Sequence, residues 1–397
     1  MRVITDNPRI LRAAGLTLAM LSFYSTLFLR VYWGPLAPYL EAEGVERELI
    51  GLVGSMFFAG YIASQIPSGV LADKKSPGYT MGVGLLASGS SNIILAITDP
   101  VLWPYISIVS GFFAGMVYGP SIKLIKELFQ EDTERAMGIY SISWSLPFLI
   151  APWSIPYIAS SWGIVYAHIV SSLGAIVVGI IDIVLLRDIA TGGSSDLEIS
   201  MILEILRRYL SRVALSSIGG FLVLFYNWVI AYWLYYYIVI SGVSAIEAST
   251  TLSVYSLVGI VSTPFAGILA RRFGLYRLLI VDLIIYSASG AWIALTPTPP
   301  ILYLLAGLLG MARYITTPLN SSILALSFEE RVLATASSAV NMFWQISGLA
   351  APYITALGFG MMSPKIVMLS LAMTPALAII PYAMLVLVVG KNYHYNN

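Results

Sequence analysis

The 25 residues from Ile301 to Ala325, ILYLLAGLLGMARYITTPLNSSILA, contain one charged side chain, Arg313, at their centre. A stretch of this length and polarity is able to cross a bilayer as a helix, which needs roughly 20 apolar residues. An arginine at that depth is costly unless it faces a protein interior or a water-filled cavity, so by default it marks a functional site. The stretch therefore predicts a membrane-spanning helix with a polar site in its middle.

Comparable apolar stretches fill the rest of the chain. Of the 397 residues, 58% are hydrophobic and only 10% are charged, and the mean hydropathy is +0.85, which no soluble globular domain matches. The apolar runs are continuous rather than alternating, which argues against a membrane β-barrel. We therefore predict an all-α membrane protein with twelve transmembrane helices. The expected spans are about 14–38, 49–71, 79–98, 101–124, 137–159, 163–186, 209–240, 246–270, 275–296, 300–325, 332–358 and 365–389.

The basic residues predict the orientation of these spans. With the N-terminus inside, seventeen of the 21 lysines and arginines fall on the cytoplasmic side, and only Arg47 and Lys365 fall on the other side. Cytoplasmic loops of membrane proteins carry an excess of positive charge. We therefore expect a cell-membrane protein with both termini in the cytoplasm and the acidic loop 41–48 on the outer face.

The chain divides into two halves of six spans each. Residues 188–208 begin as a polar, glycine- and serine-rich segment and end as a short amphipathic helix, which predicts a cytoplasmic linker between bundles at 1–187 and 209–397. A shift of 196 residues aligns Gly111 with Gly307, and further pairs follow in the same order at nearly the same offset. Several matches at one offset indicate two homologous six-helix bundles.

Short motifs at the ends of the spans point to a known family. The sequence GVLADK at 69–74 ends span two, GILARR at 267–272 ends span eight, and ER-x-x-G, with Glu134, Arg135 and Gly138, opens span five. Together with the twelve spans and the central loop, these motifs resemble the major facilitator superfamily over the whole chain. The resemblance implies two bundles that rock about a site at the midplane, with spans one, four, seven and ten lining the path.

The resemblance also implies a set of gating residues. In that family the acid of the loop motif caps or pairs with groups of the opposite bundle and stabilises one access state, and Asp73 holds its position here. An aspartate that merely completes a helix terminus is the alternative. The expected gating residues are Gly69, Asp73, Lys74, Arg135 and Arg331.

Two departures from the family disfavour proton-driven drug efflux. Drug-extruding members carry an arginine in span four, four residues before the glycine represented by Gly111, and this chain has Ser107 there. Span five also lacks the G-P-x-x-G element of antiporters. It contains instead Pro147, Pro152 and Pro156, which are expected to bend it because proline removes donors from the helix.

Two arginines fall on spans that the resemblance places around the path. Arg313 lies on span ten, where helical spacing gives it Thr317 and Asn320 as neighbours on the same face. Arg30 lies on span one, somewhat outward of its centre. Guanidinium is always charged and offers a planar fork that fits carboxylate or phosphate. We therefore expect Arg313, helped by Arg30, to bind an anionic group.

Span one adds a second, narrower resemblance. FLR at 28–30 followed by GPLAP at 34–38 is similar to the pattern of the organic-anion, organophosphate and anion-cation symporter branches. For Arg30 the alternative is an arginine that snorkels to the outer interface. For both arginines, a structural ion pair with Asp182 or Asp282 is the other alternative.

The remaining candidate contacts are aromatic or amide side chains on spans four, seven and eleven, which offer hydrogen bonds and ring faces around a small ligand. They are Tyr118, Tyr226, Asn227, Tyr232, Asn341 and Gln345. Residues 235–237, three consecutive tyrosines near the outer end of span seven, are expected to form an interfacial belt. His168 is expected to be a hydrogen-bonded packing residue.

Carboxylates are missing where many symporters carry them. No aspartate or glutamate lies well inside spans one, four, seven or ten. Asp182 and Asp282 fall on spans six and nine, which the family fold places at the periphery, so a packing role is expected for them. Coupling through a protonated substrate, anion exchange or an off-cavity acid stays open, as does the absence of coupling.

These observations favour secondary transport of a small organic anion, such as a carboxylate or a phosphate ester. The alternatives are a carrier of neutral or zwitterionic solutes such as peptides, amino acids or sugars, a carrier of lipid-like substrates, and a transporter-like sensor. An enzyme is not expected, because the chain has no cysteine, only two histidines and no nucleotide loop. The expected partners are the substrate, the lipid bilayer and either protons or a counter-anion. No metal, cofactor or nucleic acid is expected, and we expect a monomer.

Overall fold

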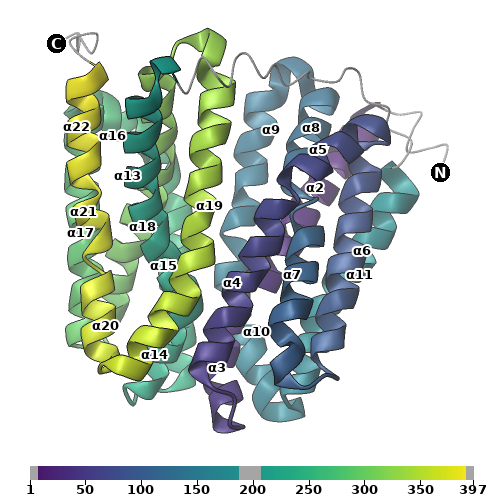
Figure 1. Ribbon diagram of the computed structural model, residues 1–397, viewed down its shortest axis with the longest axis vertical. Helices are drawn as coiled ribbons and strands as arrows, with labels where there is room; N and C mark the ends of the chain where they lie inside the picture. Colours follow the sequence, from purple (N-terminus) through teal and green to yellow (C-terminus); the bar gives the residue numbers. More distant parts are fainter. Residues whose placement is uncertain (1–7, 187–206, 390–397) are drawn as a thin grey trace. The chain divides into compact units, whose positions relative to one another are not determined.

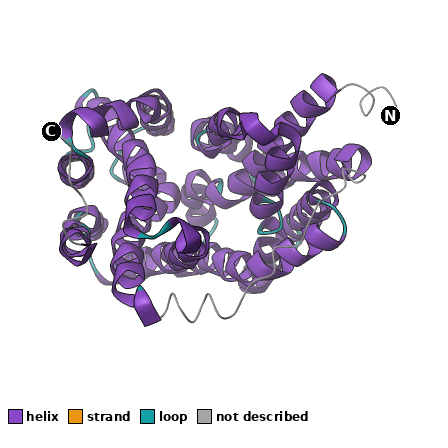
Figure 2. Ribbon diagram, turned by 90° about the horizontal axis from the view of Figure 1, so that it is seen from above, coloured by secondary structure: helices purple, strands orange, loops and turns teal. Residues whose placement is uncertain are grey.

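The computed structural model describes residues 8–186 and 207–389 (Figure 1). The chain divides into two compact units, Met1–Ser194 and Ser195–Asn397, called unit 1 and unit 2 below. All of the predicted linker except its last two residues lies outside the described residues. Helices make up both units, and no strand occurs in the described part of the chain (Figure 2).

Unit 1 contains six helical spans, and most of them are interrupted once. The interruptions coincide with residues that disfavour a continuous helix, such as the Gly34-Pro35 pair that follows the break at Tyr32. The spans are α2 (Pro8–Val31) with α3 (Trp33–Ala42), α4 (Arg47–Ala63) with α5 (Gln65–Lys74), α6 (Pro77–Leu95), α7 (Trp103–Ala114) with α8 (Tyr118–Phe129), α9 (Thr133–Tyr140) with α10 (Leu146–Trp162), and α11 (Ile164–Leu186).

Unit 2 repeats this plan with its own interruptions. Its first span passes through a π-helical turn, η4 (Ile230–Leu234), and its last span is divided near Pro375 and Pro381. The spans are α13 (Leu210–Val229) with α14 (Tyr235–Ile240), α15 (Ala245–Ser262) with α16 (Ala266–Phe273), α17 (Leu275–Leu295), α18 (Ile301–Ser327), α19 (Glu330–Met361), and α20 (Pro364–Leu371) with α21 (Thr374–Leu377) and α22 (Ile379–Val389).

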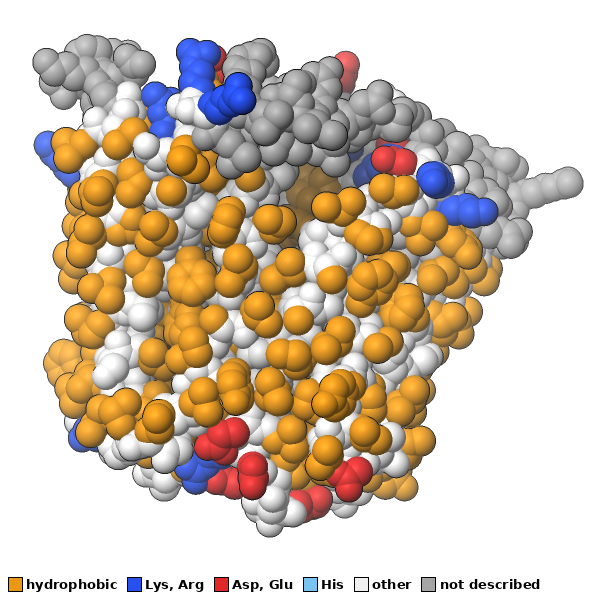
Figure 3. Space-filling view, viewed as in Figure 1, with side chains coloured by type: hydrophobic (Ala, Val, Ile, Leu, Met, Phe, Trp, Pro, Cys, Tyr) orange, Lys and Arg blue, Asp and Glu red, His pale blue; other side chains and the backbone are white. Residues whose placement is uncertain are grey.

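The twelve predicted spans are confirmed. By length and composition, eight continuous segments of the described residues suffice to cross a membrane, and the α4–α5 pair, bent by 44°, makes a ninth. One of the eight, residues 100–162, contains two spans, and α6 and α19 complete the set. On the visible face, hydrophobic side chains cover the middle of the helices and charged side chains gather toward their ends (Figure 3).

In each unit, glycine allows a pair of helices to come into backbone contact, and one such pair is equivalent in the two units. A Cβ added to Gly111 of α7 would lie 1.9 Å from the carbonyl oxygen of Phe57 on α4. A Cβ added to Gly310 of α18 would lie 1.9 Å from the carbonyl oxygen of Tyr255 on α15. Small residues allow membrane helices to approach this closely. The two contacts equate Gly111 with Gly310, so the predicted alignment with Gly307 is wrong by one helical turn. The sequence match could not separate the two because both positions are glycine.

The structure tests three local predictions, which concern the prolines of α10, the tyrosines at 235–237 and His168. α10 runs through Pro152 and Pro156 without interruption, and the break in this span lies earlier, at residues 141–144. The tyrosines at 235–237 are 0–3% exposed, so the predicted interfacial belt is wrong, because these side chains pack inside unit 2. His168 is a packing residue as expected, since its Nδ1 lies 2.7 Å from the hydroxyl of Tyr32.

Candidate functional site

Arg313 lies at the thirteenth residue of the 27-residue helix α18 and is partly buried. Its Nε donates a hydrogen bond of 2.6 Å to Oδ1 of Asn227 on α13, and its Nη1 donates one of 2.6 Å to Oγ1 of Thr317, one turn further along α18. Among the described residues, none accepts a hydrogen bond from Nη2. Two neutral acceptors thus fix the guanidinium plane while leaving one edge of the fork available.

The structure does not show the alternative role for Arg313, an ion pair with Asp182 or Asp282. Within the described residues, no carboxylate forms an ion pair with this guanidinium. Asp282 of α17 is 3% exposed and contacts Thr316 instead, at 2.5 Å between Oδ2 and Oγ1. Asp182 of α11 contacts Ser22 of α2, at 2.7 Å between Oδ2 and Oγ. Arg313 therefore keeps its charge without a buried counterion in the described part of the chain, which is the state that an anionic ligand would complete.

Arg30 of α2 is 2% exposed, so it does not snorkel to the outer interface. Its guanidinium carbon lies 4.1 Å from the ring centroid of Tyr61, and 5.6 and 5.3 Å from those of Phe57 and Phe58. All three rings belong to α4. Cation–π contacts of this kind are worth about 2 kcal/mol or more when they are desolvated. Arg30 is thus held by aromatic faces, whereas Arg313 is held by hydrogen bonds.

Tyr118 belongs to an aromatic cluster in unit 1. It begins α8, is partly exposed, and its ring centroid lies 5.3 Å from that of Phe23 and 5.6 Å from that of Trp144. Phe23 also packs on Tyr140 at 5.6 Å. The cluster joins α2, α8 and the fifth span and leaves part of the Tyr118 side chain accessible.

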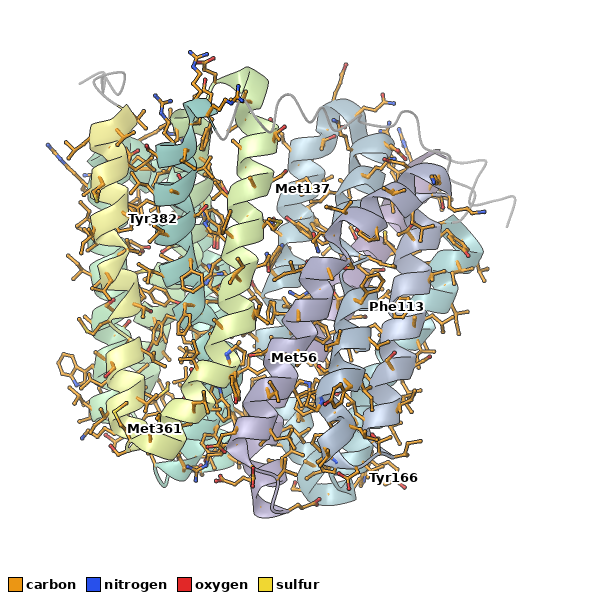
Figure 4. The ribbon with its side chains drawn as sticks, viewed as in Figure 1. Met56, Phe113, Met137, Tyr166, Met361 and Tyr382 are labelled. Atoms are coloured by element: carbon orange, nitrogen blue, oxygen red, sulfur yellow. The ribbon has the colours of Figure 1, made fainter. Side chains whose placement is uncertain are left out.

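Three of the candidate contacts in unit 2 are largely engaged by the protein itself. Tyr226 is 1% exposed, and its ring centroid lies 5.3 Å from that of Tyr286 on α17. Tyr232, in the π-helical turn, is also 1% exposed. Asn320 is 6% exposed and accepts a hydrogen bond of 2.8 Å from the hydroxyl of Tyr382 on α22. Tyr382 is labelled in Figure 4. Of the candidate contacts in the described part of the chain, only Asn227 and Thr317 accept hydrogen bonds from Arg313.

Asn341 and Gln345 lie on α19 and are partly exposed. The helix packs on α13, and it is Trp344, between the two, that makes the interhelical hydrogen bond, from Nε1 to the carbonyl oxygen of Ser216 at 3.0 Å. The two amides therefore stay available as ligand contacts, but the structure does not join them to Arg313.

The predicted gating residues of unit 1 lie at the ends of α5 and α9. Asp73 accepts a hydrogen bond from Lys123 of α8 in a partly exposed ion pair. Gly69, Lys74 and Arg135 are exposed. The side chain of Arg331 lies outside the described residues. A pairing of Asp73 with the other half of the chain stays a prediction.

Two features of the site escaped the sequence analysis. The aromatic residues around Arg30 are spaced i, i+1 and i+4 on α4. This spacing identifies them as partners of Arg30 only when α4 is already known to face α2. The hydroxyl partners of Asp182 and Asp282 carry no sequence signal at all, because they come from other spans.

Within the described residues, no group of three or more His, Cys, Asp or Glu side chains gathers in a way that would hold a metal ion.

Comparisons with known proteins place this geometry in a family. The Major Facilitator Superfamily model matches residues 17–352. Two solved structures share the fold: a bacterial homolog of the human lysosomal transporter Spinster in an inward-facing, occupied conformation, with a TM-score of 0.77, and the nucleoside transporter NupG, with a TM-score of 0.79. Each is 14% identical to this chain and covers 94% of it, with 96% and 99% of the solved chains covered.

Sequence relatives match only part of the chain. A probable hexose phosphate transport protein of Chlamydia trachomatis is 28% identical over 38% of this chain and 34% of its own length. The membrane sensor protein UhpC of Escherichia coli is 33% identical over 22% of this chain and 20% of its own length. A potential vesicular glutamate transporter of Caenorhabditis elegans, vglu-3, is 30% identical over 25% of this chain and 24% of its own length. With the family model matched across most of its length, the chain belongs to the major facilitator superfamily and is a multi-pass membrane protein.

Proposed function

We propose that this carrier transports small organic anions that bear a carboxylate or phosphate group, and that Arg313 binds that group. The observation that carries the proposal is the guanidinium of Arg313, oriented by Asn227 and Thr317 at the middle of a membrane helix, with Nη2 lacking an acceptor among the described residues. A cation at this depth costs between about 3 and 17 kcal/mol when nothing compensates its charge. An anionic ligand would supply that compensation.

The partial relatives support the same class of substrate. The names of two of them, a probable hexose phosphate transport protein and a potential vesicular glutamate transporter, refer to anions. Tyr118, Asn341 and Gln345 are proposed as further contacts, and Arg30 as a supporting charge. Arg30 offers a buried positive charge, Tyr118 a partly accessible ring, and the α19 amides hydrogen-bond donors.

We further infer that the two bundles alternate access to this site, that the termini lie in the cytoplasm, and that the loop residues around Asp73 control one of the access states. The basic residues and the GVLADK motif support these statements. The Asp73–Lys123 ion pair gives the loop a defined position against α8 from which to act.

Matched pairs of probes test the anion proposal, because each pair differs in one charge. Glucose 6-phosphate is compared with glucose, and glutamate with glutamine, in thermal-shift binding and in counterflow by proteoliposomes. A ligand stabilises the native protein in proportion to its occupancy, so the charged member of at least one pair should raise the unfolding temperature. Arg313→Ala should abolish this rise. Arg208→Ala, which removes an exposed arginine of the same unit, is the control and should leave it unchanged.

Equal stabilisation by the neutral and charged members, or wild-type affinity in Arg313→Ala, would contradict the proposal in favour of a carrier of neutral solutes. The partial match to UhpC makes a sensor the second candidate. A sensor would show binding with the charged probe and no counterflow.

A further inference from the structure

Asp282 and its hydroxyl partner form a buried acid site in unit 2. Oγ1 of Thr316 lies 2.5 Å from Oδ2 of Asp282 and 2.9 Å from the carbonyl oxygen of Ala312, one turn earlier on α18. A threonine hydroxyl has one hydrogen and can donate only one hydrogen bond. If the hydroxyl donates to the helix carbonyl, as threonines in helices often do, the second contact needs a hydrogen on the carboxyl. A protonated Asp282 lets both contacts be full hydrogen bonds, with the carboxyl donating to Thr316 and Thr316 donating to the carbonyl oxygen of Ala312.

Asp182 in unit 1 has the same kind of contact, in which a hydroxyl with one hydrogen lies close to two oxygen atoms. Oγ of Ser22 lies 2.7 Å from the carbonyl oxygen of Leu18 and 2.7 Å from Oδ2 of Asp182, which is fully buried. Oδ1 of Asp182 has no hydrogen-bond partner among the residues that the structure describes. An ionised carboxylate in such surroundings is strongly disfavoured, whereas a neutral acid that donates to a hydroxyl is not. The same arrangement of a buried carboxyl and a helix hydroxyl thus recurs in both units, and it is compatible with a protonated carboxyl within a span.

The two acids differ in how near they lie to an arginine, and Arg313 is the neighbour of Asp282. It lies three residues before Thr316 on α18, and side chains at this spacing are neighbours, with Cβ atoms about 5–6 Å apart. It is the charged side chain whose field reaches Asp282. On α17 itself, the titratable neighbour of Asp282 is Tyr286, one turn later. Asp182, by contrast, contacts Ser22, two turns before Arg30 on α2.

The helices that contact α17 bring no other carboxylate to Asp282. α16, α18, α20 and α21 pack along it, and α13 and α14 reach it through Tyr226, which lies against Tyr286, and Tyr237, which donates to the carbonyl oxygen of Ala294. None of these helices contains an aspartate or glutamate. The remaining charged or titratable side chains of α16, α17, α18, α20 and α21 are Arg271, Arg272, Tyr276, Arg277, Tyr303, Tyr314 and Lys365. Of these, the arginines, the lysine and Tyr276 lie toward helix ends, so Arg313 and Asp282 form the charge pair available at mid-helix.

We propose that Asp282 is the proton-binding residue of this carrier and that its protonation releases Arg313 to bind the anion. This inference rests on the proposed function. In the loaded carrier the anion neutralises Arg313 and Asp282 holds a proton. In the empty carrier Asp282 has lost that proton and its carboxylate neutralises Arg313, which turns from Asn227 and Thr317 toward it. Neither state leaves an uncompensated charge at the middle of the span.

The cycle moves one proton with each anion. The proton comes from the water on the side where the anion binds, occupies Asp282 during the crossing and leaves to the water on the other side after the anion has left. Because protonation and anion binding favour each other, the anion must bind more weakly as pH rises through the titration of Asp282, by at most about tenfold per pH unit for a single proton. The sequence pattern alone predicts a packing role for Asp282, and this inference replaces it.

Transport by proteoliposomes with an imposed pH gradient tests the inference. The probes are glutamate and glucose 6-sulfate, whose charges do not change near neutral pH. Wild type should accumulate the probe on the alkaline side against its gradient. Asp282→Asn imitates the protonated acid, so it should retain counterflow, bind the probe with an affinity that no longer depends on pH, and lose accumulation. Asp182→Asn is the matched control, since it removes the same kind of buried acid away from Arg313, and it should keep accumulation.

A second measurement needs no ligand. The infrared band of a protonated carboxylic acid, recorded as a function of pH, should lose one titrating component in Asp282→Asn and show a shifted one in Thr316→Val. Accumulation that persists in Asp282→Asn, or an infrared spectrum that this substitution leaves unchanged, overturns the inference. A different result is a titrating band in wild type without counterflow of any anionic probe. It would contradict the proposed anion transport and its coupling to Asp282, but it would leave Asp282 as a proton-binding site.

Discussion

The two intramembrane arginines illustrate two ways of keeping a cation inside a membrane protein. Arg313 is oriented by two neutral oxygens and remains partly accessible, whereas Arg30 lies against three aromatic rings and is 2% exposed. An arginine held by its edge can present the rest of its planar fork to a ligand. An arginine covered by ring faces contributes mainly its field and its packing. The first is suited to direct recognition and the second to a supporting charge.

Arg313→Lys should weaken anion binding although it keeps the charge. Lysine lacks the planar fork, so it cannot contact Asn227, Thr317 and a ligand oxygen in the same geometry. Hydrogen bonds to charged groups contribute about 1.5–3 kcal/mol each, so the dissociation constant for the charged probe should rise on the order of tenfold to a hundredfold. Thermal-shift titration of the two proteins measures this change. An affinity equal to wild type would mean that charge alone, without the fork, recognises the anion.

Tyr61→Leu should lower the stability of unit 1, because it removes the ring nearest to the Arg30 guanidinium. The expected loss is about 2 kcal/mol, the value for a desolvated cation–π contact. Tyr61→Phe preserves the ring face and is the matched control, with an unfolding temperature close to that of wild type. Thermal unfolding of the detergent-solubilised proteins tests this. If both variants lose the same stability, the tyrosine hydroxyl rather than the ring is responsible.

At the scale of helices, backbone contact through glycine fixes which spans lie together. The α4–α7 and α15–α18 pairs each place a carbonyl oxygen where a larger residue on the facing helix would carry its Cβ. Since membrane helices gain little from the hydrophobic effect among themselves, close packing of small residues is a main source of their association. In unit 2 this contact also sets the rotation of α18 about its own axis, and therefore the direction in which Arg313 points.

Gly310→Ala should destabilise the protein much more than Gly307→Ala. A Cβ at 310 would lie 1.9 Å from the carbonyl oxygen of Tyr255, whereas a Cβ at 307 would meet the side chain of Val258 at an ordinary 3.5 Å. Overpacking costs about 1–3 kcal/mol when side chains can move, and here the obstacle is backbone. We expect Gly310→Ala to lower the unfolding temperature or the yield of monodisperse protein, with Gly307→Ala close to wild type. Equal effects would show that the two helices are not held in contact at Gly310.

At the scale of the molecule, the absence of cysteine from the sequence makes the orientation directly testable. Single cysteines at Glu43 and Asp132, both exposed in loops between spans, should be labelled differently in intact cells by a thiol reagent that does not cross the membrane. The positive-inside bias predicts labelling of Glu43→Cys from outside and no labelling of Asp132→Cys until the cells are opened. The opposite pattern would invert the topology and assign the acidic loop to the cytoplasm.

Asp73→Asn should change how often the carrier opens to each side. The substitution removes the charge that pairs with Lys123, and a difference of a few kcal/mol between two states changes their populations by orders of magnitude. Distance distributions between spin labels on unit 1 and unit 2 should therefore differ between the variant and wild type. Asp132→Asn, which alters an exposed acid outside the motif, is the control. Identical distributions for Asp73→Asn and wild type would exclude the gating role.

The sequence by itself determined the all-α membrane class, the number of spans and the position of Arg313 at the middle of one of them. These properties depend on the composition and length of local segments, and the bilayer imposes the same requirement on every one of them. The GVLADK motif also identifies the family from sequence alone, because its residues are contiguous. The sequence could not choose between Gly307 and Gly310 as the partner of Gly111, since both are glycine and only the facing backbone separates them.

Only the tertiary structure decided the partners of the polar side chains. Asn227 reaches Arg313 from a helix 86 residues away, and Thr316 reaches Asp282 across 34 residues. Such contacts depend on the rotation of each helix about its axis, which is set by packing against its neighbours and leaves no mark in local sequence. For the same reason the tyrosines at 235–237 turned inward rather than forming a belt. Hydropathy assigns a residue to a membrane span, and helix packing decides which neighbour its side chain meets.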